Sequence, residues 1–257
     1  MTDSSDNRPA IEFRHVSYRV KGNAEADREL LHDLNLEVQR GETLVFLGRS
    51  GSGKTTTLKL INRLLTPSSG EVLVETCPTR DWDVIRLRRM IGYVIQEVGL
   101  FPHFTVERNI DLVPKIENWP ADRINARVHE LLQLVGLDPE IALRYPRELS
   151  GGQRQRVGVA RALAADPPIL LMDEPFGALD LITRAELQRE FLGLQQRLRK
   201  TVVFVTHDLR EALLLSTRIA LMEEGRLVAV ETPEEFLAST DRLAVAYKDA
   251  FGTPLRI

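Results

Sequence analysis

A glycine-rich loop, Gly48 to Thr55 (GRSGSGKT), lies between a continuous apolar run and a segment with helical periodicity. The run before it, residues 43–47, is typical of a strand that is buried on both faces. The segment after it, residues 55–65, is predicted to be a helix. This order predicts a loop whose backbone N–H groups point inward beside the positive end of a helix.

Three further apolar runs, residues 169–172, 202–205 and 219–222, share this character, and helical stretches lie between them. Alternating buried strands and helices predict a parallel α/β core. Near the N-terminus, apolar and polar residues alternate instead, over residues 11–16 and 34–38, which predicts an antiparallel sheet with one solvated face.

Residues 100–165 contain two helical segments, 125–135 and 152–164, and lack a buried strand pattern. They are therefore predicted to form a helical subdomain inserted into the α/β core. We expect residues 1–10 to be a flexible tail, residues 11–240 to form the domain, and residues 241–257 to be a C-terminal extension.

Charge and cysteine content exclude several classes of protein. The 257 residues carry 34 Lys and Arg against 37 Asp and Glu, and this net charge of -3 argues against a dedicated nucleic-acid binder. The single cysteine, Cys77, excludes an internal disulfide and a multi-cysteine zinc site. The N-terminus is polar and acidic, and every apolar run is shorter than the roughly 18 residues that a membrane helix needs. We expect a soluble chain that reaches a membrane only through a partner.

The glycine-rich loop fits the pattern G-x-x-x-x-G-K-[ST], in which backbone amides hold phosphates. Lys54 would supply a positive charge for the β- and γ-phosphates, and the Thr55 hydroxyl would ligate Mg²⁺. The alternative, a chance loop of glycine and serine, is disfavoured by the strand and helix on either side.

A second motif is the acidic pair Asp173-Glu174, which ends the apolar run at residues 169–172. In a parallel sheet this places Asp173 at the carboxyl edge, where ligands bind. Asp173 would hold the metal through water, and Glu174 would polarise a water for attack on the γ-phosphate. A solvated acidic pair at a strand end is the alternative.

A third motif is the LSGGQ segment, residues 149–153. Ser150 and Gln153 have the spacing of a capping box, so Ser150 is predicted to cap the helix that follows. Glycine inside a helix is destabilising relative to alanine, and a glycine-containing helix start also suits an anion. Both interpretations can hold together.

The order of these motifs, with His207 after a later strand, resembles that of ABC-transporter ATPase subunits from about residue 10 to about residue 240. The resemblance implies an α/β P-loop NTPase fold with a RecA-like parallel-sheet core, an N-terminal antiparallel β-subdomain and an inserted helical subdomain. Tyr18 would stack on adenine, Gln96 would touch Mg²⁺ and the attacking water, and His207 would contact the γ-phosphate. The alternatives are a strand aromatic, a loop glutamine and a surface histidine.

The resemblance therefore implies a complete set of site residues. The expected catalytic residues are Glu174, His207 and Gln96, and the expected Mg²⁺ ligands are Thr55, Gln96 and Asp173. Those expected to bind ATP are Tyr18, Gly48, Arg49, Ser50, Gly51, Ser52, Gly53, Lys54, Thr55, Thr56, Ser150, Gly151, Gly152, Gln153 and Asp180.

The same resemblance implies partners. Ser150 and Gly152 would meet the nucleotide of the opposite subunit, so we expect a homodimer that closes on ATP. It would sit at the cytoplasmic face of the cell membrane with permease subunits and, through them, an extracytoplasmic solute-binding protein. Leu100, Phe101 and Phe104 would form a groove for a permease helix, or would pack the subdomain core.

Residues 91–106, with Asn109-Ile110 and residues 113–115, resemble the ATPases of osmoprotectant importers, which take up glycine betaine, proline, choline or carnitine. Many members carry two further CBS domains. Too few residues follow Leu237 for one, so osmosensing within this chain is not expected. The alternatives are an ABC transporter for another solute and an ABC ATPase that works without a transport pore.

Overall fold

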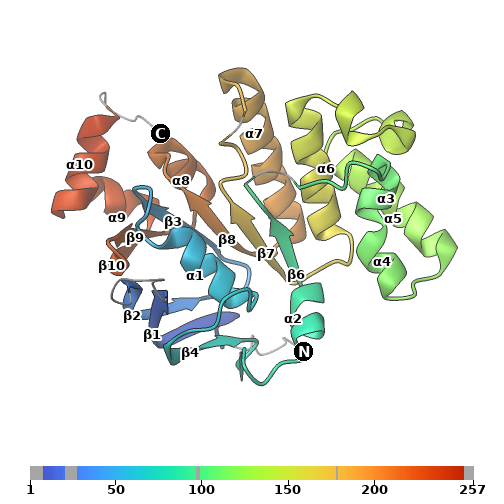
Figure 1. Ribbon diagram of the computed structural model, residues 1–257. Helices are drawn as coiled ribbons and strands as arrows, with labels where there is room; N and C mark the ends of the chain where they lie inside the picture. The colour runs from blue at the N-terminus through green and yellow to red at the C-terminus, as the bar shows by residue number, and fades with distance from the viewer. Residues whose placement is uncertain (1–7, 21–27, 97–98, 178, 252–257) are drawn as a thin grey trace, which may run out of the picture. The chain divides into compact units, whose positions relative to one another are not determined.

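The computed structural model describes residues 8–20, 28–96, 99–177 and 179–251 (Figure 1). The chain forms two compact units, one made of Met1–Trp82 with Val203–Ile257 and the other of Asp83–Val202. The second unit is thus a continuous segment that interrupts the first along the sequence. The predicted tail, residues 1–10, lies mostly outside the described residues.

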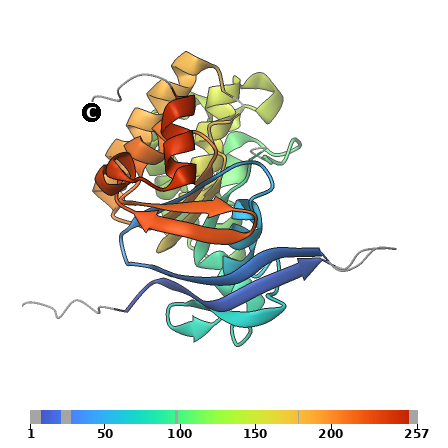
Figure 2. The same cartoon turned by 90° about the vertical axis from the view of Figure 1, so that its left-hand side faces the viewer.

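The first unit holds an antiparallel sheet of order β2-β1-β4-β5, as the alternating residues near the N-terminus predicted. In its other sheet, β3 pairs in parallel with β9, and β9 pairs antiparallel with β10. The β9–β10 pair lies over the β1–β2 pair (Figure 2), where the His32 N–H donates to the Gly225 carbonyl at 2.9 Å. The elements of this unit are β1 (Ile11–Val20), β2 (Arg28–Val38), β3 (Thr43–Gly48), α1 (Lys54–Ile61), β4 (Ser69–Val74), β5 (Cys77–Pro78), β8 (Thr201–Thr206, from Val203 onward), α8 (Leu209–Leu215), β9 (Arg218–Glu223), β10 (Arg226–Glu231), α9 (Pro233–Ala238) and α10 (Arg242–Ala250).

β1 extends to Val20, beyond the predicted end at residue 16. The alternating pattern stops early because bulges interrupt the pairing of β1 with β2. The register between β1 and β2 shifts between Phe13 and Val16 and again after Val16. His15 and Asp33 have positive φ angles of 50° and 47°. An extra residue at a bulge changes the face on which the following side chains lie. The pattern that reveals a strand in the sequence therefore breaks at this point.

α1 ends at Ile61, earlier than the predicted end at residue 65. The Asn62 side-chain oxygen accepts a hydrogen bond from the Leu64 N–H at 3.2 Å, and Arg63 has a φ of 54°. Asparagine side chains compete with the helical backbone in this way.

The described residues of the second unit form helices, two complete strands and the first two residues of β8. β6 and β7 run parallel, with Ile91 opposite Ile169 and Val94 opposite Met172. The described residues from 101 to 163 form helices and no strand, as expected; their bounds as a separate subdomain stay a prediction. α6 and α7 lie side by side (Figure 1). The elements are α2 (Val84–Arg89), β6 (Ile91–Val94), α3 (Val106–Ile110), α4 (Leu112–Ile116), α5 (Ala121–Leu134), the short 3₁₀ helices Pro139–Leu143 and Pro146–Glu148, α6 (Gly151–Leu163), β7 (Ile169–Asp173) and α7 (Leu181–Leu198).

Candidate functional site

The glycine-rich loop follows β3, every residue of which is buried. A Cβ atom on Gly48 would lie 2.5 Å from both the Met222 carbonyl oxygen and the Ser52 Oγ, so a side chain does not fit there. Gly53, the N-cap of α1, has a φ of 101°, in the left-handed region that favours glycine. The loop therefore bends tightly from the strand into the helix, as the sequence pattern predicted.

Lys54 lies inside the bend of this loop. Its side chain is buried, and its Nζ donates to the carbonyl oxygens of Gly48 and Arg49, both at 2.8 Å. Nearby, the buried Ser52 Oγ has no hydrogen-bond partner among the described residues. A buried hydroxyl without a partner is destabilising unless a ligand or water completes it. An ammonium group, an unpaired hydroxyl and a helix start together suit a polyphosphate.

The other residues of the loop and of the helix start differ in their exposure to solvent. Arg49, Ser50 and Gly51 are exposed, whereas Thr55 and Thr56, in the first turn of α1, are half-buried. The exposed residues form the side of the loop that a ligand from solvent can reach.

Tyr18 and His207 belong to the same unit as this loop. Tyr18 is half-buried in β1 opposite Leu31, and a Cβ on Gly53 would lie 2.6 Å from the Leu31 Cδ2. Only one strand therefore separates Tyr18 from the start of α1. His207 is exposed directly after β8, on a turn in which Thr206 Oγ1 donates to Glu211 at 2.6 Å.

Gln96 and Glu174 meet in the second unit. The Gln96 Nε2 donates to the Glu174 Oε2 at 3.3 Å, although 78 positions separate them. They meet because β6 and β7 are parallel neighbours, and each residue follows the carboxyl end of its strand. Asp173 is buried at the end of β7. Burial, and secondly the charge of Asp173, raise the pKa of the nearby Tyr93.

The predicted capping box in the LSGGQ segment is confirmed. Ser150 Oγ accepts from the Gln153 N–H at 3.2 Å, and Gln153 Oε1 accepts from the Ser150 N–H at 2.9 Å. Gly151 is exposed and Gly152 is buried. This segment therefore presents a firmly held helix start.

Asp180 is the N-cap of α7 and acts through its own side chain. Its Oδ1 accepts from the N–H groups of Ile182 and Thr183 at 3.2 and 3.1 Å. These hydrogen bonds, with Thr183 the foremost partner, hold the pKa of Asp180 below its ordinary value. The preceding Ala178 lies outside the described residues.

The predicted site residues thus divide between the units. The glycine-rich loop, Tyr18 and His207 belong to the first, and Gln96, the acidic pair, the LSGGQ segment and Asp180 belong to the second. Sequence reasoning missed Thr183, whose methyl group lies against Gly152 of the LSGGQ helix. The available signal was its position three residues after Asp180, the residue that caps α7. Among the described residues, no helix combines the length and apolar content needed to cross a membrane.

Comparison with known proteins places the chain in a family. The family model described as "ABC transporter" matches residues 31–177. The chain is 52% identical over 227 residues to the choline transport ATP-binding protein OpuBA of Bacillus subtilis, covering 88% of this chain and 58% of that protein. It is 51% identical over 223 residues to the glycine betaine uptake system ATP-binding protein YehX of Escherichia coli, covering 87% of this chain and 71% of that protein.

A solved structure agrees with these relatives. The dimeric post-hydrolysis state of the ATP-binding cassette MJ0796, bound to ADP and Pi, superimposes with a TM-score of 0.79 at 34% identity, covering 87% of this chain and 98% of that one. The fold is therefore that of an ATP-binding cassette, with its parallel-sheet core and antiparallel β-subdomain. On this evidence the chain belongs to the ABC transporter family.

Proposed function

We propose that this chain is the ATP-binding and ATP-hydrolysing subunit that powers an importer of osmoprotectants such as glycine betaine, proline or choline. The observation that carries the proposal is the glycine-rich loop, where the Lys54 ammonium lies against two loop carbonyls beside the unpaired Ser52 hydroxyl. The names of OpuBA and YehX, which give choline transport and glycine betaine uptake, supply the solute class.

In the proposed reaction, water attacks the γ-phosphorus of ATP and the bond to the β-γ bridging oxygen breaks, giving ADP and phosphate. Glu174 takes the proton of the attacking water, and Gln96, its hydrogen-bond partner, orients that water. Lys54 and His207 stabilise the charge that develops on the γ-phosphoryl oxygens. Tyr18 stacks on adenine.

The residues suit Mg²⁺ as the accompanying ion. Mg²⁺ prefers oxygen ligands and is usually held by one or two protein groups together with phosphate oxygens. The Thr55 hydroxyl, the Gln96 amide oxygen and the buried Asp173 carboxylate provide such ligands. The ion would neutralise phosphate charge and so favour attack by water. Asp173 is buried at the carboxyl end of β7, which supports this assignment.

Two copies of the chain would form the working unit. In this proposal the LSGGQ segment and Asp180 of each copy face the nucleotide bound by the other, so ATP closes the dimer and hydrolysis opens it. The dimer would lie at the cytoplasmic face of the membrane against permease subunits, which a solute-binding protein serves from outside.

A groove of about 460 Å³ in the second unit suits a permease helix. Phe101, Leu112 and Val113 line its apolar part, and three of its described lining residues are arginines while none is acidic: Arg88, Arg89 and Arg161. We therefore expect a short apolar helix that carries acidic side chains. Phe104 packs on the Phe101 ring, with centroids 5.3 Å apart, and is not among the lining residues.

Uptake of labelled glycine betaine, in cells that lack other betaine systems, tests the proposal. Lys54→Ala should abolish uptake and ATP hydrolysis, whereas Lys59→Ala, at the other end of α1, should preserve both. Hydrolysis that survives Lys54→Ala would refute the site. An active ATPase that copurifies with a permease but supports no betaine uptake would refute the solute and point to another one. An active ATPase that copurifies with no membrane protein would favour a role outside transport.

A further inference from the structure

The first turns of α6 and α7 contact each other at Gly152 and Thr183. A Cβ atom on Gly152 would lie 2.7 Å from the Thr183 Cγ2, far inside the ordinary contact range of 3.4–4 Å. Gly152 is also buried. The Thr183 methyl therefore fills the space that a side chain at position 152 would take.

Thr183 also lies in the turn that Asp180 caps. Its backbone N–H donates to the Asp180 Oδ1 at 3.1 Å. One residue thus joins the Asp180 turn, through its N–H, to the LSGGQ helix, through its methyl group.

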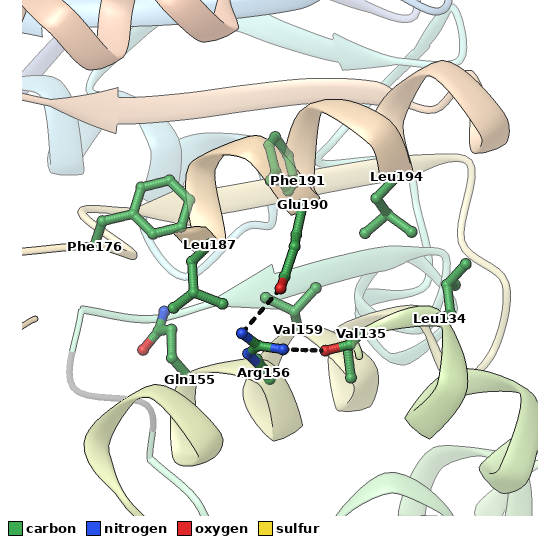
Figure 3. A pocket seen from close by; sticks show the side chains of 10 residues that line it. All are labelled: Leu134, Val135, Gln155, Arg156, Val159, Phe176, Leu187, Glu190, Phe191 and Leu194. Carbon is green, nitrogen blue, oxygen red and sulfur yellow. Dashed lines mark hydrogen bonds and ion pairs between the residues drawn. The ribbon is translucent and has the colours of Figure 1, made fainter. Parts of the chain in front are cut away.

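A second contact joins the same helices further along, four residues on in α6 and seven in α7 (Figure 3). Arg156 of α6 forms an ion pair with Glu190 of α7 at 2.9 Å. The Arg156 Nη1 also donates to the carbonyl oxygens of Val135 and Gly136, at 3.2 and 3.1 Å, beyond the end of α5. The guanidinium therefore holds three segments of the second unit together.

Arg156 and Glu190 also line a cavity of about 30 Å³. Its lining is mostly apolar, and the buried Gln155 Nε2 that borders it has no hydrogen-bond partner among the described residues (Figure 3). One water needs about 15 Å³ of such space, so about two waters fit. An engineered cavity that binds benzene measures about 150 Å³, so this space is too small for an organic ligand.

We propose that Thr183 is a positioning residue that fixes the LSGGQ turn relative to the Asp180 turn, so that both reach the nucleotide of the partner subunit together. The inference rests on the proposed function, in which both turns face that nucleotide. Thr183 itself touches neither nucleotide nor water in this account; it acts through Gly152 and Asp180.

A set of variants in the full-length chain tests the inference. Gly152→Ala introduces a methyl that must displace Thr183 by about 1 Å, and a misplacement of that size can lower kcat by about a hundredfold. Affinity of the single subunit for a fluorescent ATP analogue should be unchanged, because in the proposed dimer Gly152 faces only the nucleotide that the other copy binds. Thr183→Ser removes only the methyl and keeps the hydroxyl, so the double variant Gly152→Ala/Thr183→Ser should recover kcat to within about threefold.

The matched control is Gly152→Ala/Thr183→Val, which keeps a branched, stiff side chain and loses the hydroxyl. It should stay as slow as Gly152→Ala. Thr183→Ser and Thr183→Val alone are the references for the two double variants. Thermal melting of each variant separates a positioning role from a loss of folding.

The outcomes are distinct. A Gly152→Ala protein with wild-type kcat overturns the inference, and so does a double variant with serine that melts like wild type but stays about a hundredfold slow. If Gly152→Ala alone fails to fold, the kcat of the folded serine double variant decides in the same way. A wild-type chain that does not hydrolyse ATP refutes the proposed function instead.

Discussion

Replacing Asn109 by aspartate should destabilise the protein by about 3 kcal/mol. Asn109, on α3, is fully buried. Its Nδ2 donates to the carbonyl oxygens of Phe101, Phe104 and Thr105, at 3.2, 3.2 and 2.9 Å. Its Oδ1 accepts from the Phe101 N–H at 2.8 Å. Aspartate has nearly the same shape and can still accept, but it loses the two N–H donors that these three carbonyl oxygens share, each worth about 1.5 kcal/mol.

The loss should grow with pH. The introduced carboxyl would be buried and would face three carbonyl oxygens. Both effects disfavour its charged form, so its pKa rises above the unfolded value of about 3.9. The folded state then binds more protons than the unfolded state, so stability is highest below the unfolded pKa and falls as pH rises through the folded pKa. A protonated carboxyl also donates one hydrogen bond back to a carbonyl oxygen.

Urea denaturation at about pH 5 and about pH 8 measures both effects. Asn125→Asp, on the exposed side of α5, is the matched control and should change the free energy of unfolding by less than about 0.5 kcal/mol. If Asn109→Asp were as stable as this control at the higher pH, the segment from Phe101 to Thr105 would not depend on these hydrogen bonds. A greater loss at the lower pH would refute the argument about the carboxyl.

Two further predictions concern the site. Glu174→Gln should leave ATP binding intact and trap a closed dimer, because an amide cannot take the proton of the attacking water; normal turnover in this variant would exclude Glu174 as the general base. Since burial and the Asp173 charge raise the pKa of Tyr93, the free energy of unfolding should fall as pH rises above about 10, and Tyr93→Phe should reduce that slope in denaturant titrations. An unchanged slope would show that Tyr93 titrates alike in both states.

Features that depend on neighbours in sequence could be predicted from the sequence. The capping box joins Ser150 and Gln153, three positions apart, and the glycine-rich loop depends on a strand, a loop and a helix that follow one another. The extra length of β1 could not, because the pairing register with β2 changes at His15 and reverses the alternation. A period of two reveals a strand only while the strand is regular.

The contacts that assemble the site needed the structure. Gln96 and Glu174 are 78 positions apart, and neither residue reveals that β6 pairs with β7. Once two strands are known to be parallel neighbours, the residues after their carboxyl ends are expected to meet. Strand order was thus the missing information. Thr183 is a different case, because its contact with Gly152 depends on the side-chain packing of two helices.

The two glycines of the LSGGQ segment now have different explanations. Each is destabilising in a helix by about 1 kcal/mol relative to alanine. Gly152 has a reason within the chain, because Thr183 occupies the space of its missing side chain. Gly151 has none among the described residues: it is exposed, its φ is not positive, and a Cβ there would approach no described atom closer than 3.8 Å. Under the proposed function, glycine at position 151 leaves room for the nucleotide bound by the partner subunit to approach the backbone.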